Sequence, residues 1–462
     1  MRAAFTLVSA IGRFALPALA LLLAGLPSVL RAGPGALNRP NVVFILVDDL
    51  GVDWVHAYGA DHPTPNLDRL ASGGVRFETA WTSPICTPSR VMMLTGQYPG
   101  RTGWIEHYDV PRWGGAGLQP SRIETWPQLL HTNGYATAIA GKWQINDLRA
   151  PVDILQQHGF DHHCVWPGVE AGNPKSEKRY WDAFLQTDGV RRVHVGEYGP
   201  DITQRFALEF IRTNRDQPFL LYYPMILVHA PNEATPLNRD PPPANEDLRY
   251  AGSVTYMDRQ VGELLDELSR LGLDSRTAVI FAGDNGSSSS GMMHGHRIPA
   301  GKGTLTQRGV QVPLIVRAPM LTPGGWATSE LTDFSDIFPS LLELVGLQSP
   351  LHQAEDGKSW VPLLRRDTAY LPRRWIQAQR DLGRTIRDHR YKLNSDGRFF
   401  DLKTDPDERH PLNAADNPIW EASRDNLASV LASLPATGPA PFPEYSPNRM
   451  REYQRLHSKD KN

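Results

Sequence analysis

Continuous runs of apolar residues, each ending in a short polar cluster, recur along the chain. The clearest run, residues 41–47, reads Asn-Val-Val-Phe-Ile-Leu-Val, and Asp48 and Asp49 follow it directly. Runs of the same kind cover residues 136–140, 218–223, 277–282 and 312–316. Apolar runs rich in β-branched residues, without polar alternation, are typical of strands buried on both faces of a parallel sheet.

Segments with helical periodicity lie between these runs. Over residues 254–271 the apolar side chains keep helical spacing, and Gly272 closes the element. Strands alternating with helices predict an α/β fold, with a large, mostly parallel central sheet and helices on both faces. In such sheets, polar sites gather beyond the carboxyl ends of the strands.

The pattern of apolar and polar residues changes near residue 371. Short strand-like runs separated by Gly and Asp turns follow, at residues 375–378, 385–387 and 391–393. They predict a small C-terminal antiparallel α+β subdomain over residues 371–435, after a main domain over residues 38–370. The remainder, residues 436–462, is rich in Pro and charge and is expected to form an extended tail.

The first 32 residues predict a secretory signal peptide. Arg2 and Arg13 precede a Leu- and Ala-rich stretch, and small residues follow it. The stretch is shorter than the roughly 20 residues that a membrane span needs, and Pro17 interrupts it, so a retained anchor is the weaker alternative. We therefore expect an exported protein, periplasmic or secreted, with no stable membrane span after signal removal.

Composition restricts the partners and the use of cysteine. Lys and Arg number 48 against 50 Asp and Glu, which leaves a formal charge of −2 and no strong field for nucleic acid. Any attraction for anions must therefore be local. The two cysteines, Cys86 and Cys164, taken alone suggest one disulfide or two inert thiols.

The residues around Cys86 change that interpretation. Residues 86–96 read Cys-Thr-Pro-Ser-Arg-Val-Met-Met-Leu-Thr-Gly and match Cys-x-Pro-Ser-Arg-x-x-x-x-Thr-Gly at every fixed position. The chain thus resembles the formylglycine-dependent, arylsulfatase-like sulfatases, which share the alkaline phosphatase superfamily fold. The resemblance implies that a maturation enzyme oxidises Cys86 to Cα-formylglycine, leaving Cys164 unpaired. It also implies that Arg90 holds the aldehyde hydrate and a metal-bound carboxylate through its planar fork.

Two oxygen-rich pairs, each after an apolar run, form the second candidate element. They are Asp48 with Asp49 and Asp284 with Asn285. Each pair alone would more often cap a helix or form a turn. Buried carboxylates raise one another's pKa, and a divalent cation removes the conflict. All-oxygen ligation suits Ca²⁺, or alternatively Mg²⁺, and together the pairs look like the sulfatase metal site, to which residue 86 would add a ligand.

Three further residues match functional positions of the family. Lys142 and Lys302 would bind the sulfate group, and the glycines beside Lys302 allow close backbone approach to a ligand. His229 matches the histidine that faces the leaving-group oxygen. Lone lysines and loop histidines are otherwise more often solvated or structural.

The chain departs from the family pattern at three positions. Gln144 stands where most relatives have a histidine, and Gln307 and Gln311 replace a Glu and an Arg. An amide cannot take a proton near neutral pH, so Gln144 cannot replace a histidine base in the sulfate-release step. An aspartate, water, His294 or His296 would have to do so.

The resemblance implies hydrolysis of sulfate esters, and a sulfated carbohydrate is the preferred class. Aromatic side chains can stack on sugar rings, although ordinary packing explains them equally simply. They are Trp104, Tyr108, Trp113, Trp166, Tyr180 and Trp181. Candidates to bind a carboxylate or a second sulfate group of the substrate are His294, His296 and Arg297.

Three other functions stay open. A phosphodiester or phosphonate hydrolase would use the same site, and a sulfated-glycan-binding protein with impaired turnover would fit Gln144. A hydrolase with Cys86 as a plain thiol is the least favoured, because the sequence shows no histidine next to Cys86.

Overall fold

The computed structural model describes residues 39–115, 117–368 and 370–438. The predicted signal peptide lies outside these ranges, as does nearly all of the predicted tail. None of the helices in the described ranges is long and apolar enough to cross a membrane.

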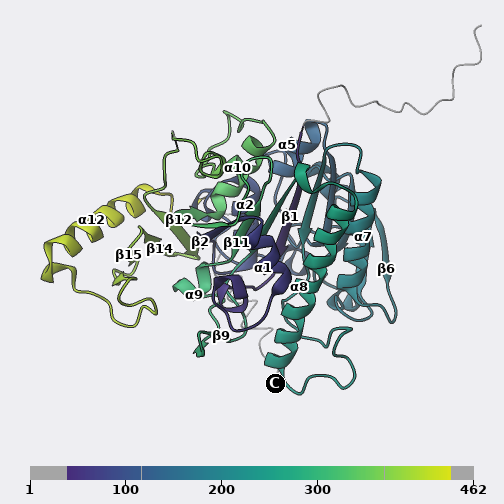
Figure 1. Cartoon of the computed structure of the whole chain (residues 1–462), viewed down its shortest axis with the longest axis horizontal. Helices are drawn as coiled ribbons and strands as arrows, with labels where there is room; N and C mark the ends of the chain where they lie inside the picture. The colour runs from purple at the N-terminus through teal and green to yellow at the C-terminus, as the bar shows by residue number, and fades with distance from the viewer. Residues whose placement is uncertain (1–38, 116, 369, 439–462) are drawn as a thin grey trace, which may run out of the picture.

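A ten-stranded mixed sheet runs through the body of the molecule (Figure 1), in the order β12-β2-β11-β8-β1-β7-β3-β4-β5-β6. The neighbours β8, β1, β7, β3 and β4 are all parallel, whereas β11 runs antiparallel to both β8 and β2. The mostly parallel central sheet is therefore confirmed. Its strands are β1 (Asn41–Val47), β2 (Val75–Trp81), β3 (Ala136–Lys142), β4 (His162–Trp166), β5 (Phe184–Thr187), β6 (Val190–Val193), β7 (Phe219–Pro224), β8 (Thr277–Gly283), β11 (Leu314–Arg317) and β12 (Trp326–Asp333).

Strand β1 shows why the apolar runs are continuous. All seven of its residues are buried, and alternate side chains enter two separate cores. One core holds the apolar residues of α2 (Cys86–Thr95), α5 (Trp126–Thr132) and α10 (Ile337–Leu344). The other holds those of α1 (Pro65–Ser72), α7 (Gly199–Thr213) and α8 (Glu246–Arg270). Helices thus cover both faces of the sheet, as predicted, and α7 and α8 lie side by side in Figure 1.

Helix α8 begins earlier than its apolar periodicity predicts. The Asn245 side chain accepts a hydrogen bond from the Leu248 backbone N–H at 2.9 Å and caps the helix. The first two turns are mostly polar, and Tyr250 is their buried residue, so the hydrophobic pattern does not reveal them.

Short elements complete the main body. The small hairpin is β9 (Gly291–Met293) with β10 (His296–Ile298). The short helices are α3 (Pro99–Thr102), α4 (Val110–Trp113), α6 (Ile154–Gln157), α9 (Gln307–Val310) and α11 (Val361–Leu364). The 3-10 turns are η2 (Val52–Trp54), η3 (His56–Tyr58), η4 (Pro174–Glu177), η5 (Asp274–Arg276), η6 (Phe334–Asp336) and η7 (Ala414–Asp416).

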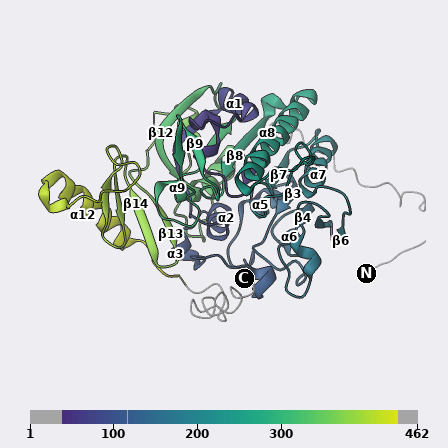
Figure 2. The same ribbon diagram turned by 90° about the horizontal axis from the view of Figure 1, so that it is seen from below.

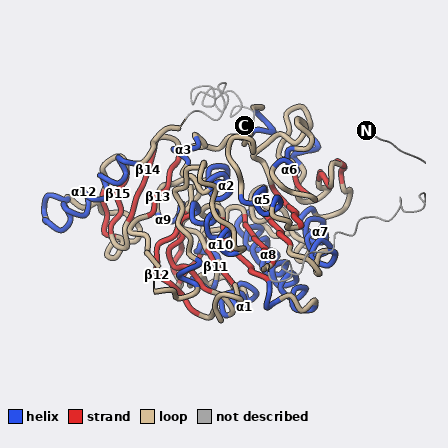
Figure 3. Tube along the Cα trace, turned by 90° about the horizontal axis from the view of Figure 1, so that it is seen from above, coloured by secondary structure: helices blue, strands red, loops and turns tan. Residues whose placement is uncertain are grey.

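A separate four-stranded antiparallel sheet lies at one end of the molecule (Figures 2 and 3). It consists of β13 (Ile376–Arg380), β14 (Gly383–Arg387), β15 (Tyr391–Asn394) and β16 (Phe399–Asp401). Leu427 and Leu431 of α12 (Pro418–Ser433) pack on this sheet and close a small core. The C-terminal antiparallel subdomain is therefore confirmed, whereas its boundaries and those of the main domain stay predictions.

Candidate active site

The two oxygen-rich pairs meet at the carboxyl ends of β1 and β8. These strands are parallel neighbours, so the residues that follow them leave the sheet at the same edge. The Asp49 backbone N–H donates to Asp284 Oδ1 at 3.0 Å, and Asn285 Nδ2 donates to Asp49 Oδ1 at 2.9 Å. Asp48 is also fully buried, like the other three. The fold thus assembles one oxygen-lined cluster from segments far apart in sequence.

Two lysines neutralise this cluster. Lys142 ends β3, and its Nζ lies 2.6 Å from Asp48 Oδ2; Lys302 Nζ lies 2.6 Å from Asp49 Oδ2. Burial disfavours the charged form of Asp48, but the positive charges of Lys142 and Arg90 outweigh it and hold the Asp48 pKa well below the usual value. Lys142 is buried, whereas the Lys302 side chain is 27% exposed and so lies on the open side of the cluster.

Arg90 joins the start of α2 to the same cluster. It lies one turn after Cys86, and its Nε and terminal nitrogen donate to Asp284 Oδ2 at 3.0 and 2.8 Å. A third nitrogen donates to the Lys142 backbone carbonyl at 3.1 Å. The guanidinium therefore holds a candidate metal-ligand carboxylate through its planar fork, and this contact fixes the first turn of α2 against β8.

Cys86 begins α2 and is 3% exposed. Its Sγ lies 3.7 Å from His107 Nδ1 and 3.9 Å from Gln144 Oε1. Burial opposes ionisation of the thiol, but the charges of Lys142 and His107 outweigh it and lower the Cys86 pKa to about 6. Cys164 is also unpaired, in β4, and burial raises its pKa to about 11. The two cysteines are therefore electrostatically distinct.

The expectation that no histidine lies next to Cys86 is wrong, because His107 does. His107 follows Cys86 by 21 residues, in the connection between α3 and α4. Neither a motif nor strand-end spacing marks it in the sequence. The one local signal is a titratable residue among the aromatic residues Trp104, Tyr108 and Trp113.

His229 lies in the loop after β7, as expected. Its Nδ1 is 2.6 Å from the Ala230 carbonyl oxygen, which only accepts, so Nδ1 carries a proton. Nε2 lies 3.9 Å from Asp49 Oδ2. Burial lowers the His229 pKa to about 3 despite the nearby aspartates Asp49 and Asp48. The ring is therefore neutral at neutral pH, with an unprotonated Nε2 facing the carboxylates.

The donor set fits a hard divalent cation. Asp48 Oδ1 and Asn285 Oδ1 are buried and have no hydrogen-bond partner among the described residues. Bare buried oxygens are costly, and a cation removes that cost. One ligand atom from each of Asp48, Asp49 and His229 also lies within 4.8 Å of the others. Carboxylate and amide oxygens are the ligands that Ca²⁺ and Mg²⁺ prefer.

The other departures from the family pattern have structural explanations. Gln307 Oε1 accepts from Trp81 Nε1 at 3.3 Å and from an Arg387 nitrogen at 3.1 Å, which ties the main body to the C-terminal sheet. Gln311 Nε2 donates to the Glu78 carbonyl at 2.9 Å. Neither amide replaces a charged group in the cluster around Asp49.

Three residues of the β9–β10 hairpin lie exposed. They are His294, His296 and Arg297. The hairpin is anchored through Met292, whose carbonyl accepts from the Asp61 backbone N–H at 2.8 Å. Within the described residues neither histidine hydrogen-bonds to Cys86, so the structure does not bring the suggested replacement bases to residue 86.

Most of the aromatic candidates serve packing. Trp104, Tyr108, Trp166 and Tyr180 are buried in the two large cores. Trp113 and Trp181 are half-buried, and the Arg239 guanidinium lies 3.8 Å above the Trp181 ring. These two rings are the aromatic candidates that keep exposed surface.

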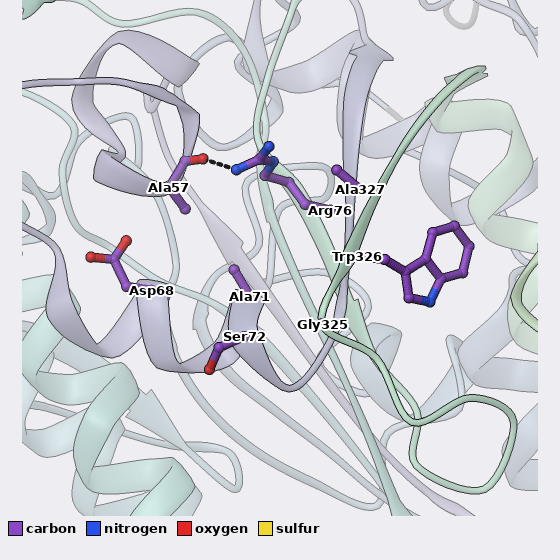
Figure 4. A pocket seen from close by; sticks show the side chains of 8 residues that line it. All are labelled: Ala57, Asp68, Ala71, Ser72, Arg76, Gly325, Trp326 and Ala327. Carbon is purple, nitrogen blue, oxygen red and sulfur yellow. Dashed lines mark hydrogen bonds between the residues drawn. The ribbon is translucent and has the colours of Figure 1, made fainter.

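A pocket of about 320 Å³ lies apart from this cluster (Figure 4). Residues from η3, α1, β2 and β12 line it, among them Asp68, Arg76 and Trp326. Figure 4 shows Arg76 turned to the Ala57 carbonyl. None of the predicted site residues lines this pocket, so it is separate from the candidate active site.

Comparisons with known proteins agree with this arrangement. The family model described as Sulfatase matches residues 40–347. Mouse (Mus musculus) steryl-sulfatase is 31% identical, with 73% of this chain and 66% of that protein covered. Rat (Rattus norvegicus) N-acetylgalactosamine-6-sulfatase is 31% identical, with 74% and 69% covered. The crystal structure of Ps i-CgsB has a TM-score of 0.76 at 25% identity, with 91% and 99% covered.

The chain spans about two thirds of the length of these two curated relatives. The matched residues include the ten strands of the central sheet, the Cys86 segment and both oxygen-rich pairs. The observed fold and the position of the candidate active site at the ends of β1 and β8 agree with this family match. The chain belongs to the sulfatase family, sulfuric ester hydrolases of the alkaline phosphatase superfamily.

Proposed function

We propose that the protein hydrolyses carbohydrate sulfate esters at residue 86, after a maturation enzyme has converted Cys86 to formylglycine. The observation that supports it most is the position of Cys86. It begins α2 beside Lys142, and the Arg90 fork links the same helix turn to Asp284. The hydrate of formylglycine supplies a nucleophilic hydroxyl where a thiol now lies.

The chain's own cations bind the sulfate group in this proposal. Lys142 and Lys302 pair with the two aspartates that follow β1, and in this proposal they balance charge on the sulfuryl oxygens. Each such preorganised donor is worth about 3 kcal/mol in the transition state. Ca²⁺, or alternatively Mg²⁺, would be held by Asp48, Asp49, Asp284, Asn285 and residue 86, and supplies Lewis acidity at that residue.

His229 protonates the departing alcohol in this proposal. Its Nδ1 is fixed on the Ala230 carbonyl, so Nε2 is the atom that gives the proton. The ring is neutral in the structure, because burial lowers its pKa to about 3. The negative charge of a bound sulfate ester favours the protonated ring, so we expect His229 to become charged when substrate binds.

The carbohydrate class rests on a relative and on surface chemistry. Rat N-acetylgalactosamine-6-sulfatase carries a sugar in its name, and the half-buried Trp113 is a candidate for stacking on a sugar ring, whereas the Arg239 guanidinium already covers a face of Trp181. We also propose export, on the signal-like N-terminus.

A second candidate is a hydrolase with Cys86 as an unmodified thiolate. The contact with His107 and the lowered Cys86 pKa favour it, and they remove the sequence argument against it. Phosphodiester and phosphonate esters are alternative substrates for the same lysines and metal.

The test is hydrolysis by protein from a host with the converting machinery. We expect release of sulfate from 4-nitrophenyl sulfate and from sulfated monosaccharides, and faster turnover than with the matching phosphodiester and phosphonate. Cys86→Ala should abolish turnover. Cys164→Ala, a matched change of the other buried cysteine, should retain it. Turnover of the phosphorus esters alone, or equal turnover by Cys86→Ala, would contradict the proposal.

A further inference from the structure

The substitution at position 144 leaves one proton transfer without a group to perform it. In the proposed function, sulfate leaves residue 86 only when a proton is removed from the remaining hydroxyl of that residue. Gln144 Oε1 lies 3.9 Å from Cys86 Sγ, but an amide does not take a proton near neutral pH. Water or another side chain must therefore accept it.

His107 lies at the same atom from a different element. Among the described residues, His107 and Gln144 are the two whose side chains hydrogen-bond to Cys86 Sγ, at 3.7 and 3.9 Å. Of the two, only the imidazole is a base. His229 faces Asp49 instead, and His294 lies in the exposed β9–β10 hairpin. His107, from the α3–α4 connection, is thus the histidine that lies beside residue 86.

We propose that His107 is the catalytic residue that accepts the proton during sulfate release, an inference that rests on the proposed function. After transfer, the former Cys86 Cβ carries one hydroxyl and one sulfate ester. His107 takes the hydroxyl proton, and the O–H electron pair forms the new C=O bond. The carbon–oxygen bond to sulfate breaks, and its electrons leave with sulfate. The aldehyde is regained without an oxidant or reductant, and the proton passes from His107 to water.

Thr87 suits both proton states of the ring. Its Oγ1 lies 2.9 Å from His107 Nδ1. In the resting site the Thr87 hydroxyl donates to the single lone pair of an unprotonated Nδ1. The hydroxyl turns away when that lone pair takes the proton of residue 86, and it can then accept from the protonated ring. The Trp113 ring lies edge-on to the imidazole, with 5.8 Å between the ring centroids, and limits its rotation. Nδ1 is therefore held toward residue 86 before and after it takes the proton.

The C-terminal subdomain holds the segment that carries His107. Arg380, at the end of β13, pairs with Glu106 at 3.2 Å, and the Asp381 backbone N–H donates to the Ile105 carbonyl at 2.6 Å. Arg380 also donates to the Gly303 carbonyl at 2.6 Å, beside Lys302. The same subdomain residue thus anchors the His107 segment and the Lys302 loop.

The experiment compares His107→Ala and His107→Gln with the unmutated protein on 4-nitrophenyl sulfate. We expect both variants to release about one equivalent of 4-nitrophenol and then to turn over about 100-fold more slowly or worse. Intact mass of the residue-86 peptide should show an added sulfo group. Gln144→His in the His107→Ala background should restore turnover and remove the adduct. His352→Ala, at a 73% exposed histidine, is the matched control and should behave like the unmutated protein.

The outcomes separate this inference from the proposed function. An unmutated protein that hydrolyses no sulfate ester overturns the proposed function itself. If the unmutated protein is active and His107→Gln turns over at the same rate without an adduct, His107 is not the base. Loss of the first equivalent of 4-nitrophenol, in variants that melt like the unmutated protein and carry formylglycine, places His107 in the attack step and overturns its assignment to sulfate release.

Discussion

Lys142 Nζ lies 2.6 Å from Asp48 Oδ2, and both side chains are almost fully buried. Asp48 Oδ1 lies 3.8 Å from Arg90, which also pairs with Asp284. The site therefore holds its charges as a balanced buried network. Such networks are costly to break, because removal of one partner leaves an uncompensated charge.

The first prediction concerns this pair. Lys142→Met removes the cation and should lower the free energy of unfolding by about 3–5 kcal/mol as well as abolish turnover. Urea unfolding at neutral pH measures the loss of unfolding free energy. The double variant Lys142→Met/Asp48→Asn, which removes both charges, should recover part of the stability. An unchanged unfolding midpoint for Lys142→Met would show that the pair contributes nothing.

The second prediction concerns Gly141, which positions Lys142 at the end of β3. Gly141 has φ +122°, and a Cβ there would fall on the Pro224 carbonyl oxygen. Gly134 also has a positive φ, +83°, but has open space around its Cβ position. Gly134→Ala should therefore cost about 1–2 kcal/mol through backbone strain alone. Gly141→Ala should cost clearly more and displace Lys142; equal melting temperatures for the two variants argue against this.

The third prediction is the ionisation of unconverted Cys86. In protein from a host without the converting machinery, kept in chelator, thiolate ultraviolet absorbance should rise with a midpoint near pH 6. The Cys86 pKa is lower in the folded protein than in the unfolded chain, where it is about 8.5. Ionised Cys86 therefore adds to the free energy of unfolding above about pH 8.5, and this contribution is lost as the pH falls toward 6. Cys164→Ala should leave the transition in place, since the Cys164 pKa is about 11. If the transition disappears in Cys164→Ala, it comes from Cys164, and the assignment to Cys86 is wrong.

The fourth prediction is metal stabilisation. Ca²⁺ at one hundred times its Kd should raise the free energy of unfolding by about 2.7 kcal/mol, and Mg²⁺ serves as the comparison. Asn285→Leu removes a buried bare oxygen and should weaken this effect while the chelated protein still folds. Thermal unfolding with and without chelator checks both. A full calcium response in Asn285→Leu would place the ion elsewhere.

Much of the fold follows from the sequence because its strands are buried on both faces. The run at residues 41–47 coincides with β1, and the strand-end rule predicts that Asp48 and Asp284 converge. The N-terminal turns of α8 escaped prediction, because they are polar and depend on the Asn245 cap. Propensity and periodicity carry no signal for such a start.

The site residues that belong to a motif or follow a strand could be predicted from the sequence. The site residue in an irregular loop could not. His107 comes from an irregular connection, and its approach to Cys86 depends on Thr87 and on the contact of Arg380 with Glu106. Those contacts join distant parts of the chain. Nothing local in the sequence encodes them, so the neighbour of Cys86 is visible only once the chain is folded.

The central claim is that residue 86 is formylglycine in the active protein. Intact mass analysis of the tryptic peptide that contains position 86 tests it most directly, on protein that has been assayed for sulfate release. The account predicts the aldehyde or its hydrate, in proportion to the measured activity. An unmodified thiol in protein that hydrolyses sulfate esters at full rate would contradict it and would favour the Cys86–His107 thiolate instead.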